Sequence, residues 1–148
     1  ILVFADADVI LGNQLVERAV DALDAGAALA HPREAIYDSE GWNLALWLPQ
    51  IFRTPMNTTR CIVVTRQVFD AVGGYDPNCN PITERCREDL DFGRRVAELY
   101  GKASIKVLPA LIATSARRYK KYGAAGGWEH FDDPVRAYTV RSVTERNR

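Results

Sequence analysis

The first residues able to do chemistry are two carboxylates, Asp6 and Asp8, which directly follow the apolar run 1–5. At the end of a strand, two acids separated by one residue can face the same crevice and offer the hard oxygen ligands that Mg²⁺ or Mn²⁺ prefers. A metal shared with a diphosphate would then neutralise leaving-group charge as a Lewis acid. The alternative is that an aspartate only caps the turn after the strand.

A second carboxylate pair, Glu88 and Asp89, stands at the expected start of a helix over residues 87–100. The helix macrodipole stabilises negative charge there, which by itself accounts for both acids. If this helix start faces a cleft, one of the carboxylates can instead deprotonate an acceptor hydroxyl as a general base. Because the dipole favours the ionised carboxylate, it lowers the pKa of the carboxyl group. For the role of a general base, burial or a neighbouring acid would have to raise this pKa again.

The third candidate is the basic run 117–121, with Arg117 and Arg118 at its start. Guanidinium groups bind phosphate oxygens through two parallel hydrogen bonds, so this run can clamp a phosphate. A solvated helix face is the alternative. Both histidines, His31 and His130, are expected to be structural or exposed, although His130 can reach a metal in the fold.

The composition is that of an ordinary soluble globular domain, with 148 residues, 47% hydrophobic and 26% charged. The 19 basic and 19 acidic side chains cancel, so no overall field favours nucleic acid or an anionic membrane. No apolar run reaches the roughly 18 residues of a membrane-spanning helix, and no basic segment marks a signal peptide. We therefore expect a cytoplasmic protein that does not bind nucleic acid.

The chain has three cysteines, Cys61, Cys79 and Cys86. They are few and odd in number, which argues against a disulfide framework. Cys79 and Cys86 are also too far apart for a common zinc knuckle. Cys61 lies in an apolar run and is expected to be a small core residue. The cysteines therefore favour a reducing compartment.

The elements that must position these residues alternate between strand and helix, which is typical of an α/β fold. The expected order is a buried strand 1–5, helix 15–23 capped by Asn13 and stopped by Gly26, strand 27–31, loop 32–40, strand 60–65, helix 66–72 stopped by Gly73 and Gly74, turn 75–77, loop 78–87, helix 87–100 capped by Gly101, and strands 103–108 and 111–114. The aromatic segment 42–52 leaves three interpretations open: a lid or acceptor-binding segment, a helix packed on the core, or an interfacial membrane anchor.

The order of four motifs resembles the C-terminal portion of the family 2 glycosyltransferases, which have the GT-A fold. The motifs are a strand followed by Asp6-Ala7-Asp8, a helix ending in Val72-Gly73-Gly74-Tyr75-Asp76, the helix start Arg87-Glu88-Asp89-Leu90-Asp91, and the segment Thr114-Ser115-Ala116-Arg117-Arg118. The similarity covers roughly residues 1–127. It implies an α/β, GT-A-like (Rossmann-like) mixed sheet with flanking helices, in a single domain over 1–148 with 128–148 as an unassigned tail.

The resemblance also implies that the domain is truncated, because the nucleotide-binding part of such a domain would precede Ile1. An incomplete domain of this kind is expected to be a poor catalyst on its own. It is also expected to expose the edge of its first strand.

By this resemblance the chain would belong to an inverting enzyme that transfers a sugar from a nucleotide-diphosphate donor to an acceptor hydroxyl. Asp6 and Asp8 would be the motif that binds Mn²⁺ or Mg²⁺, with Asp8 as the usual ligand and Asp6 near the donor's ribose or sugar. Asp89 would be the general base, and Glu88 would orient the base or the acceptor. The remaining matches are Gly74, Tyr75 and Asp76 at the donor-sugar and acceptor site, and Arg117 and Arg118 near the donor phosphates.

The chain departs from the family in two respects. Residues 113–115 include no histidine, which some GT-A enzymes use as a metal ligand, so the metal would rely on Asp8, the diphosphate and water. No Gln-x-x-Arg-Trp sequence is present, which disfavours a processive polysaccharide synthase. The acceptor (a glycan, a lipid or a small molecule) and a peripheral association with the inner face of a membrane stay open.

Two other functions are open at this point. A haloacid-dehalogenase-type phosphatase also begins with an apolar strand that leads into Asp-x-Asp, and would use Asp6 as nucleophile and Asp8 as acid and base. Against it, no Gly-Asp-x-x-x-Asp metal loop follows. A non-catalytic interaction domain would use Trp42, Trp47 and Trp128 as its binding surface.

Overall fold

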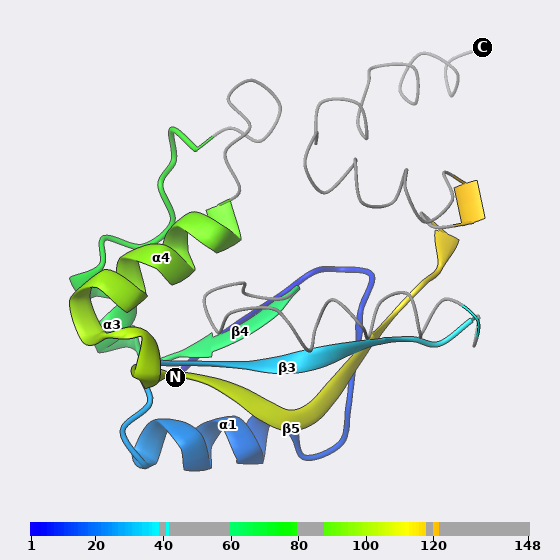
Figure 1. The fold of residues 1–148 in the computed structure, drawn as a ribbon, viewed down its shortest axis with the longest axis horizontal. Helices are drawn as coiled ribbons and strands as arrows, with labels where there is room; N and C mark the ends of the chain where they lie inside the picture. The colour runs from blue at the N-terminus through cyan, green and yellow to red at the C-terminus, as the bar shows by residue number, and fades with distance from the viewer. Residues whose placement is uncertain (39–40, 42–59, 80–87, 118–119, 122–148) are drawn as a thin grey trace.

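The computed structural model describes residues 1–38, 41, 60–79, 88–117 and 120–121 (Figure 1). Over these residues one five-stranded mixed sheet carries helices on both faces, as the α/β prediction required. The predictions for segment 42–52, for Cys86, Arg118 and His130, and for the tail 128–148 lie outside the described residues. Among the described helices, none combines the length and the apolar character needed to cross a membrane.

The strands lie in the order β1-β4-β3-β5-β2. Their bounds are β1 (Leu2–Ala5), β2 (Ile10–Leu11), β3 (Leu29–Ile36), β4 (Cys61–Val64) and β5 (Ile105–Thr114). β3 and β5 are parallel, whereas β1 with β4, β4 with β3, and β2 with β5 are antiparallel. Within the described part of the chain β1 is an edge strand, as predicted.

Different helices cover the two faces of the sheet (Figure 1). α1 (Leu15–Asp24) packs on one face, and α3 (Arg66–Ala71) and α4 (Glu88–Tyr100) pack on the other. All four residues of β4 are buried, because side chains alternate along a strand and both faces of this strand are covered. Cys61 and Val63 contribute to the α1 core, and Ile62 and Val64 to the α4 core.

The predicted helix 66–72 is confirmed, together with its end signals. Thr65 caps the start of α3, since its hydroxyl accepts a hydrogen bond from the backbone N–H of Val68 at 3.1 Å. Gly73 and Gly74 end the helix with φ values of 81° and 66°, a region that favours glycine. A Cβ on Gly74 would also approach the Phe69 ring to 3.0 Å. This glycine pair therefore fixes the turn that leads to Tyr75.

The second half of β3 corrects the prediction of a loop over residues 32–40. Residues Arg33 to Ile36 pair in parallel with Leu111 to Thr114 of β5. The two predicted strands 103–108 and 111–114 are one strand, β5, for the same reason, with an irregular register between Val107 and Leu111. Residues 103 and 104 are not part of it, because they belong to the short 3-10 helix Lys102–Ser104. The polar side chains of this segment suggested a loop. Pairing with β5 provides hydrogen-bond partners for the backbone N–H and C=O groups, and this does not depend on which side chains the segment carries.

Two further predictions about the first residues are wrong. The strand at the N-terminus is not fully buried: Leu2 and Phe4 are partly buried while Val3 is 41% exposed, because only the face of β1 that packs against the α3 and α4 core is covered. Gln14 rather than Asn13 occupies the N-cap position of α1, with φ 62° and no side-chain cap. Its amide instead accepts a hydrogen bond from Arg18.

The cysteines divide into one that matches the prediction and one that contradicts it. Cys61 is fully buried, and burial together with the negative charge of Asp6 raises the pKa of its thiol to about 11. Cys79 is disulfide-bonded, against the expectation of reduced cysteines. Sequence spacing can indicate only the common disulfide frameworks and zinc sites. A single disulfide can form wherever the fold brings the Cα atoms of two cysteines within about 7 Å of each other. The argument for a reducing compartment fails with this prediction.

Candidate active site

The backbone pairing between β1 and β4 continues one residue beyond the strands and sets the position of Asp6. The Asp6 N–H donates to the carbonyl of Arg60 at 2.9 Å. The two side chains then meet, with Arg60 Nη1 3.3 Å from Asp6 Oδ2. The first acid of the Asp6-Ala7-Asp8 motif is therefore paired with an arginine that no sequence motif indicated.

A buried acid on β3 lies in the same group of charges. Glu34 is only 6% exposed, and its Oε1 accepts a hydrogen bond from the backbone N–H of Arg60 at 3.3 Å. Burial is the main cause that raises the pKa of Asp6, and the charges of Asp8 and Glu34 add to it, while Arg60 acts in the opposite direction. Arg60 is thus the partner that favours the ionised form of Asp6 and keeps its pKa from rising further.

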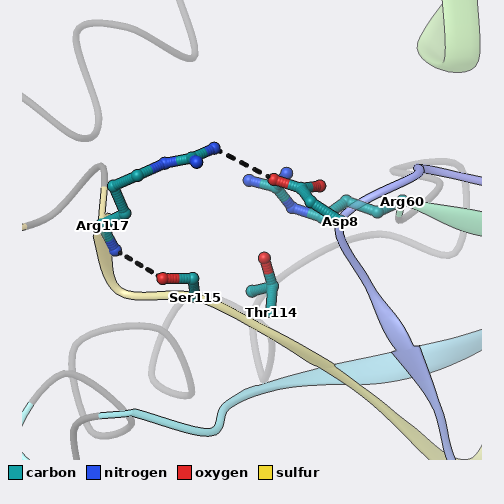
Figure 2. Close-up of a pocket in the computed structure, with 5 residues that line it drawn as sticks. All are labelled: Asp8, Arg60, Thr114, Ser115 and Arg117. Atoms are coloured by element: carbon teal, nitrogen blue, oxygen red, sulfur yellow. Dashed lines mark hydrogen bonds and ion pairs between the residues drawn. The ribbon is translucent and has the colours of Figure 1, made fainter.

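Asp8 contacts an arginine that lies near the C-terminal end of the described residues. Its Oδ2 lies 3.4 Å from Nη2 of Arg117, whose side chain is 81% exposed. Figure 2 shows this contact at a small pocket of about 30 Å³, which is lined by Asp8, Arg60, Thr114, Ser115 and Arg117. Two guanidinium groups, two hydroxyls and one carboxylate therefore surround one space, with more positive than negative charge.

The turn that carries Arg117 is held by Asp38, a residue that lies just after β3. Asp38 Oδ1 accepts a hydrogen bond from the N–H of Ala116 at 2.6 Å, and Oδ2 accepts from the Ser115 hydroxyl at 2.9 Å. Lys120 adds an ion pair at 3.2 Å. These partners, the Ala116 N–H foremost, lower the pKa of Asp38 from 3.8 to about 2. Asp38 thereby fixes one wall of the pocket.

The low pKa of Asp38 predicts a stability effect with a defined direction. A carboxyl whose pKa is lower in the folded than in the unfolded chain stabilises the fold at pH above its unfolded value and loses this effect as it becomes protonated. The stability difference between the wild-type chain and Asp38→Ala should therefore be constant above pH 3.8 and shrink as the pH falls towards 2. Thermal unfolding across this range measures it. A difference that does not change with pH would contradict the assignment.

Tyr75 connects the strand that carries Asp6 to the helix that carries Asp89. Its ring centroid lies 5.2 Å from that of Phe4 on β1 and 5.1 Å from that of Phe92 on α4. Phe69 on α3 completes the group, 5.1 Å from Phe4 and 5.6 Å from Phe92. These four rings, here called the aromatic cluster, join β1, α3 and α4 at one end of the sheet.

The pKa of the Tyr75 hydroxyl is affected by acids from both acidic motifs. Burial is the main cause that raises the pKa of its hydroxyl, and the charges of Asp89, Glu88 and Asp6 raise it further, in that order. The phenol is therefore neutral at physiological pH and can donate a hydrogen bond. The two acidic motifs, far apart in sequence, both act on this one side chain.

Arg95 anchors the glycine turn to α4. Its Nε contacts Asp91 Oδ2 at 2.8 Å, and its Nη1 donates to the carbonyl of Val72, directly before Gly73. The guanidinium also lies 5.8 Å from the centroid of the Phe92 ring. Arg94 shares Asp91, and these bonds lower the pKa of that carboxyl. Asp91 is thus structural, and it helps to hold the Tyr75 turn against the helix that begins with Glu88 and Asp89.

The other predicted site residues are placed as follows. Glu88 is exposed and Asp89 partly buried, both in the first turn of α4, as predicted. Asp76 is exposed, and its Oδ1 accepts a hydrogen bond from the N–H of Asn78 at 2.8 Å in its own turn. Gly74 is buried under Phe69. The charges of Asp6, Glu88 and Asp89 thus all act on the Tyr75 hydroxyl, whereas Asp8 pairs with Arg117.

The donor set suits a metal that is shared with a ligand rather than one held by protein alone. In the described part of the chain, no three His, Cys, Asp or Glu side chains gather as metal ligands. Mg²⁺ is commonly bound by one or two carboxylates together with substrate phosphates and water. Asp8, half-exposed beside Asp6, can provide one such carboxylate next to two arginines that attract phosphate.

Comparisons with protein-family models, with curated proteins and with solved structures give no match to this chain.

Proposed function

We propose that the chain forms the acceptor and metal-binding part of an inverting glycosyltransferase of the GT-A type, which transfers a sugar from a nucleotide diphosphate to an acceptor hydroxyl. The observation that carries the proposal is the position of Tyr75, whose ring packs against Phe4, two residues before Asp6, and against Phe92, one helical turn after Asp89. The pocket with one acid and two arginines adjoins Asp6, because Arg60 pairs with Asp6. A transferase of this kind needs a base for the acceptor at one place and positive charge for a diphosphate beside it.

In the proposed reaction, Asp89 takes the proton of the acceptor hydroxyl. The acceptor oxygen forms a bond to the anomeric carbon of the donor, and the bond from that carbon to the phosphate oxygen breaks. The electron pair leaves with the nucleotide diphosphate, and the configuration at the anomeric carbon inverts. Glu88, next to the base and more exposed, orients the acceptor or Asp89 itself.

Positive charge for the leaving diphosphate would come from two sources. When bound through Asp8 and the diphosphate, Mn²⁺ or Mg²⁺ supplies Lewis-acid stabilisation of the leaving group. Arg117 is the chain's own cation at that place, and its pair with Asp8 is exposed enough to exchange partners at little cost.

The first test is a calorimetric titration of nucleoside diphosphates in the presence of Mn²⁺, carried out on the natural protein. Asp8→Asn keeps the shape of the side chain but removes the charge, so it should weaken Mn²⁺ binding by at least about a hundredfold. Metal-dependent nucleotide binding should be lost with it, while the unfolding temperature should change little because Asp8 is half-exposed.

Asp70→Asn is the matched control, because Asp70 is also an exposed aspartate but lies on α3 and does not line the pocket. It should leave Mn²⁺ affinity unchanged. Unchanged Mn²⁺ affinity in folded Asp8→Asn would remove the metal assignment. Failure of every nucleoside diphosphate to bind, together with a phosphorylated Asp6 after treatment with a phosphate ester, would instead identify a phosphatase.

A further inference from the structure

The two arginines of the pocket differ in how they are held. Arg117 is 81% exposed, and its guanidinium reaches across the pocket mouth to Asp8 (Figure 2). Arg60 is 15% exposed and directly precedes β4, which lies between β1 and β3 in the sheet. One cation at this pocket is therefore exposed to solvent, and the other is largely buried.

Three contacts fix Arg60, and none of them uses the same atoms. Its carbonyl accepts the Asp6 N–H, its own N–H donates to the buried Glu34, and its Nη1 pairs with Asp6 Oδ2. The next residue, Cys61, is fully buried in β4. Two of these contacts hold the Arg60 backbone, and the ion pair with Asp6 holds the guanidinium, which is 15% exposed. A side chain held by an ion pair and by burial loses little conformational entropy when it binds a ligand, which favours oriented binding.

The lining of the pocket points to the chemistry of its ligand. Arg60 and Arg117 supply guanidinium N–H donors, and Thr114 and Ser115 supply hydroxyls, against the single carboxylate of Asp8. Guanidinium forks match the geometry of phosphate oxygens and bind them through two parallel hydrogen bonds. A space of about 30 Å³ admits a small polar group but no nucleoside or sugar ring. The fitting ligand is a single phosphate group at the pocket mouth.

We propose that Arg60 is a phosphate-binding residue of this pocket, which holds one phosphate of the donor's diphosphate in a fixed position while Arg117 closes over it. This rests on the proposed function for the identity of the donor, but not for the binding of phosphate itself. Asp6 then has a second role, since its pair with Arg60 orients the guanidinium.

The test is the binding of inorganic pyrophosphate to the natural protein, measured by calorimetry with and without Mg²⁺. Removal of one charged hydrogen-bonding partner should weaken binding by about ten- to a hundredfold in Arg60→Gln. Arg60→Lys keeps the charge but loses the planar fork, so it should fall between Arg60→Gln and the wild type. Arg66→Gln is the matched control: Arg66 is 67% exposed on α3, and its loss should not change the affinity.

Arg60→Gln leaves the carboxylate of Asp6 without its cation, which can destabilise the fold. The double variant Asp6→Asn with Arg60→Gln removes both charges and gives the same test in a folded chain. Wild-type affinity for pyrophosphate in either folded variant, or no pyrophosphate binding by the wild type, would overturn the proposal.

The outcome is separable from that of the proposed function. If Arg60 is required for pyrophosphate binding but no nucleotide sugar is turned over, Arg60 keeps its role and the transferase proposal fails. If sugar transfer occurs and pyrophosphate binding does not depend on Arg60, the transferase proposal survives and the role of Arg60 is refuted.

Discussion

Asp89→Asn is expected to lower kcat for sugar transfer by about 10²- to 10⁴-fold, the usual contribution of a general base. Asparagine has the same shape but cannot accept the proton of an acceptor hydroxyl. Asp89 is partly buried at the start of α4, close enough to Tyr75 for its charge to raise the pKa of the phenol. The measurement is steady-state turnover of the natural protein with its nucleotide-sugar donor.

Two neighbours in the same helical turn serve as controls. Glu88→Gln should lower kcat less than Asp89→Asn, because Glu88 orients rather than takes the proton. Asp91→Asn should reduce stability more than turnover, because Asp91 holds Arg94 and Arg95. Undiminished turnover in Asp89→Asn would exclude it as the base. A loss of turnover that merely follows the fraction of unfolded protein would also contradict the assignment.

Phe92→Ala should reduce the free energy of unfolding by about 3–5 kcal/mol, which is a large part of the stability of a typical domain. Phe92 is fully buried, and its ring lies against Phe69 and Tyr75 of the aromatic cluster. Its removal leaves a cavity where α4 meets β1 and α3. Urea unfolding followed by circular dichroism measures the loss.

Leu99→Ala on the same helix is the control. Leu99 is 57% exposed, so its truncation should change the free energy of unfolding by no more than about 0.5 kcal/mol. An equal effect of the two substitutions would mean that the aromatic cluster does not hold α4. Because Phe92 lies one helical turn after Asp89, on the same side of α4, Phe92→Ala should also reduce turnover in the fraction that stays folded.

The helices, and the ends of α3, could be predicted because their signals are local, although the predicted N-cap of α1 was wrong. Thr65 caps α3 through a residue three positions away, and Gly73 and Gly74 end it within the same turn. The acids at the start of α4 respond to the dipole of their own helix. The second half of β3 could not be predicted in this way. It is a strand because its backbone pairs with β5, which lies much later in the chain.

The sequence by itself therefore determined which residues can do chemistry: Asp6, Asp8, Glu88 and Asp89 are acids at element ends whatever the fold. Only the tertiary structure decided their partners. Arg60 meets Asp6 across 54 positions, and Asp38 binds the N–H of Ala116 across 78. Sequence periodicity reports burial along one element, whereas these contacts depend on strand order and register between elements, which are set by the packing of the whole sheet.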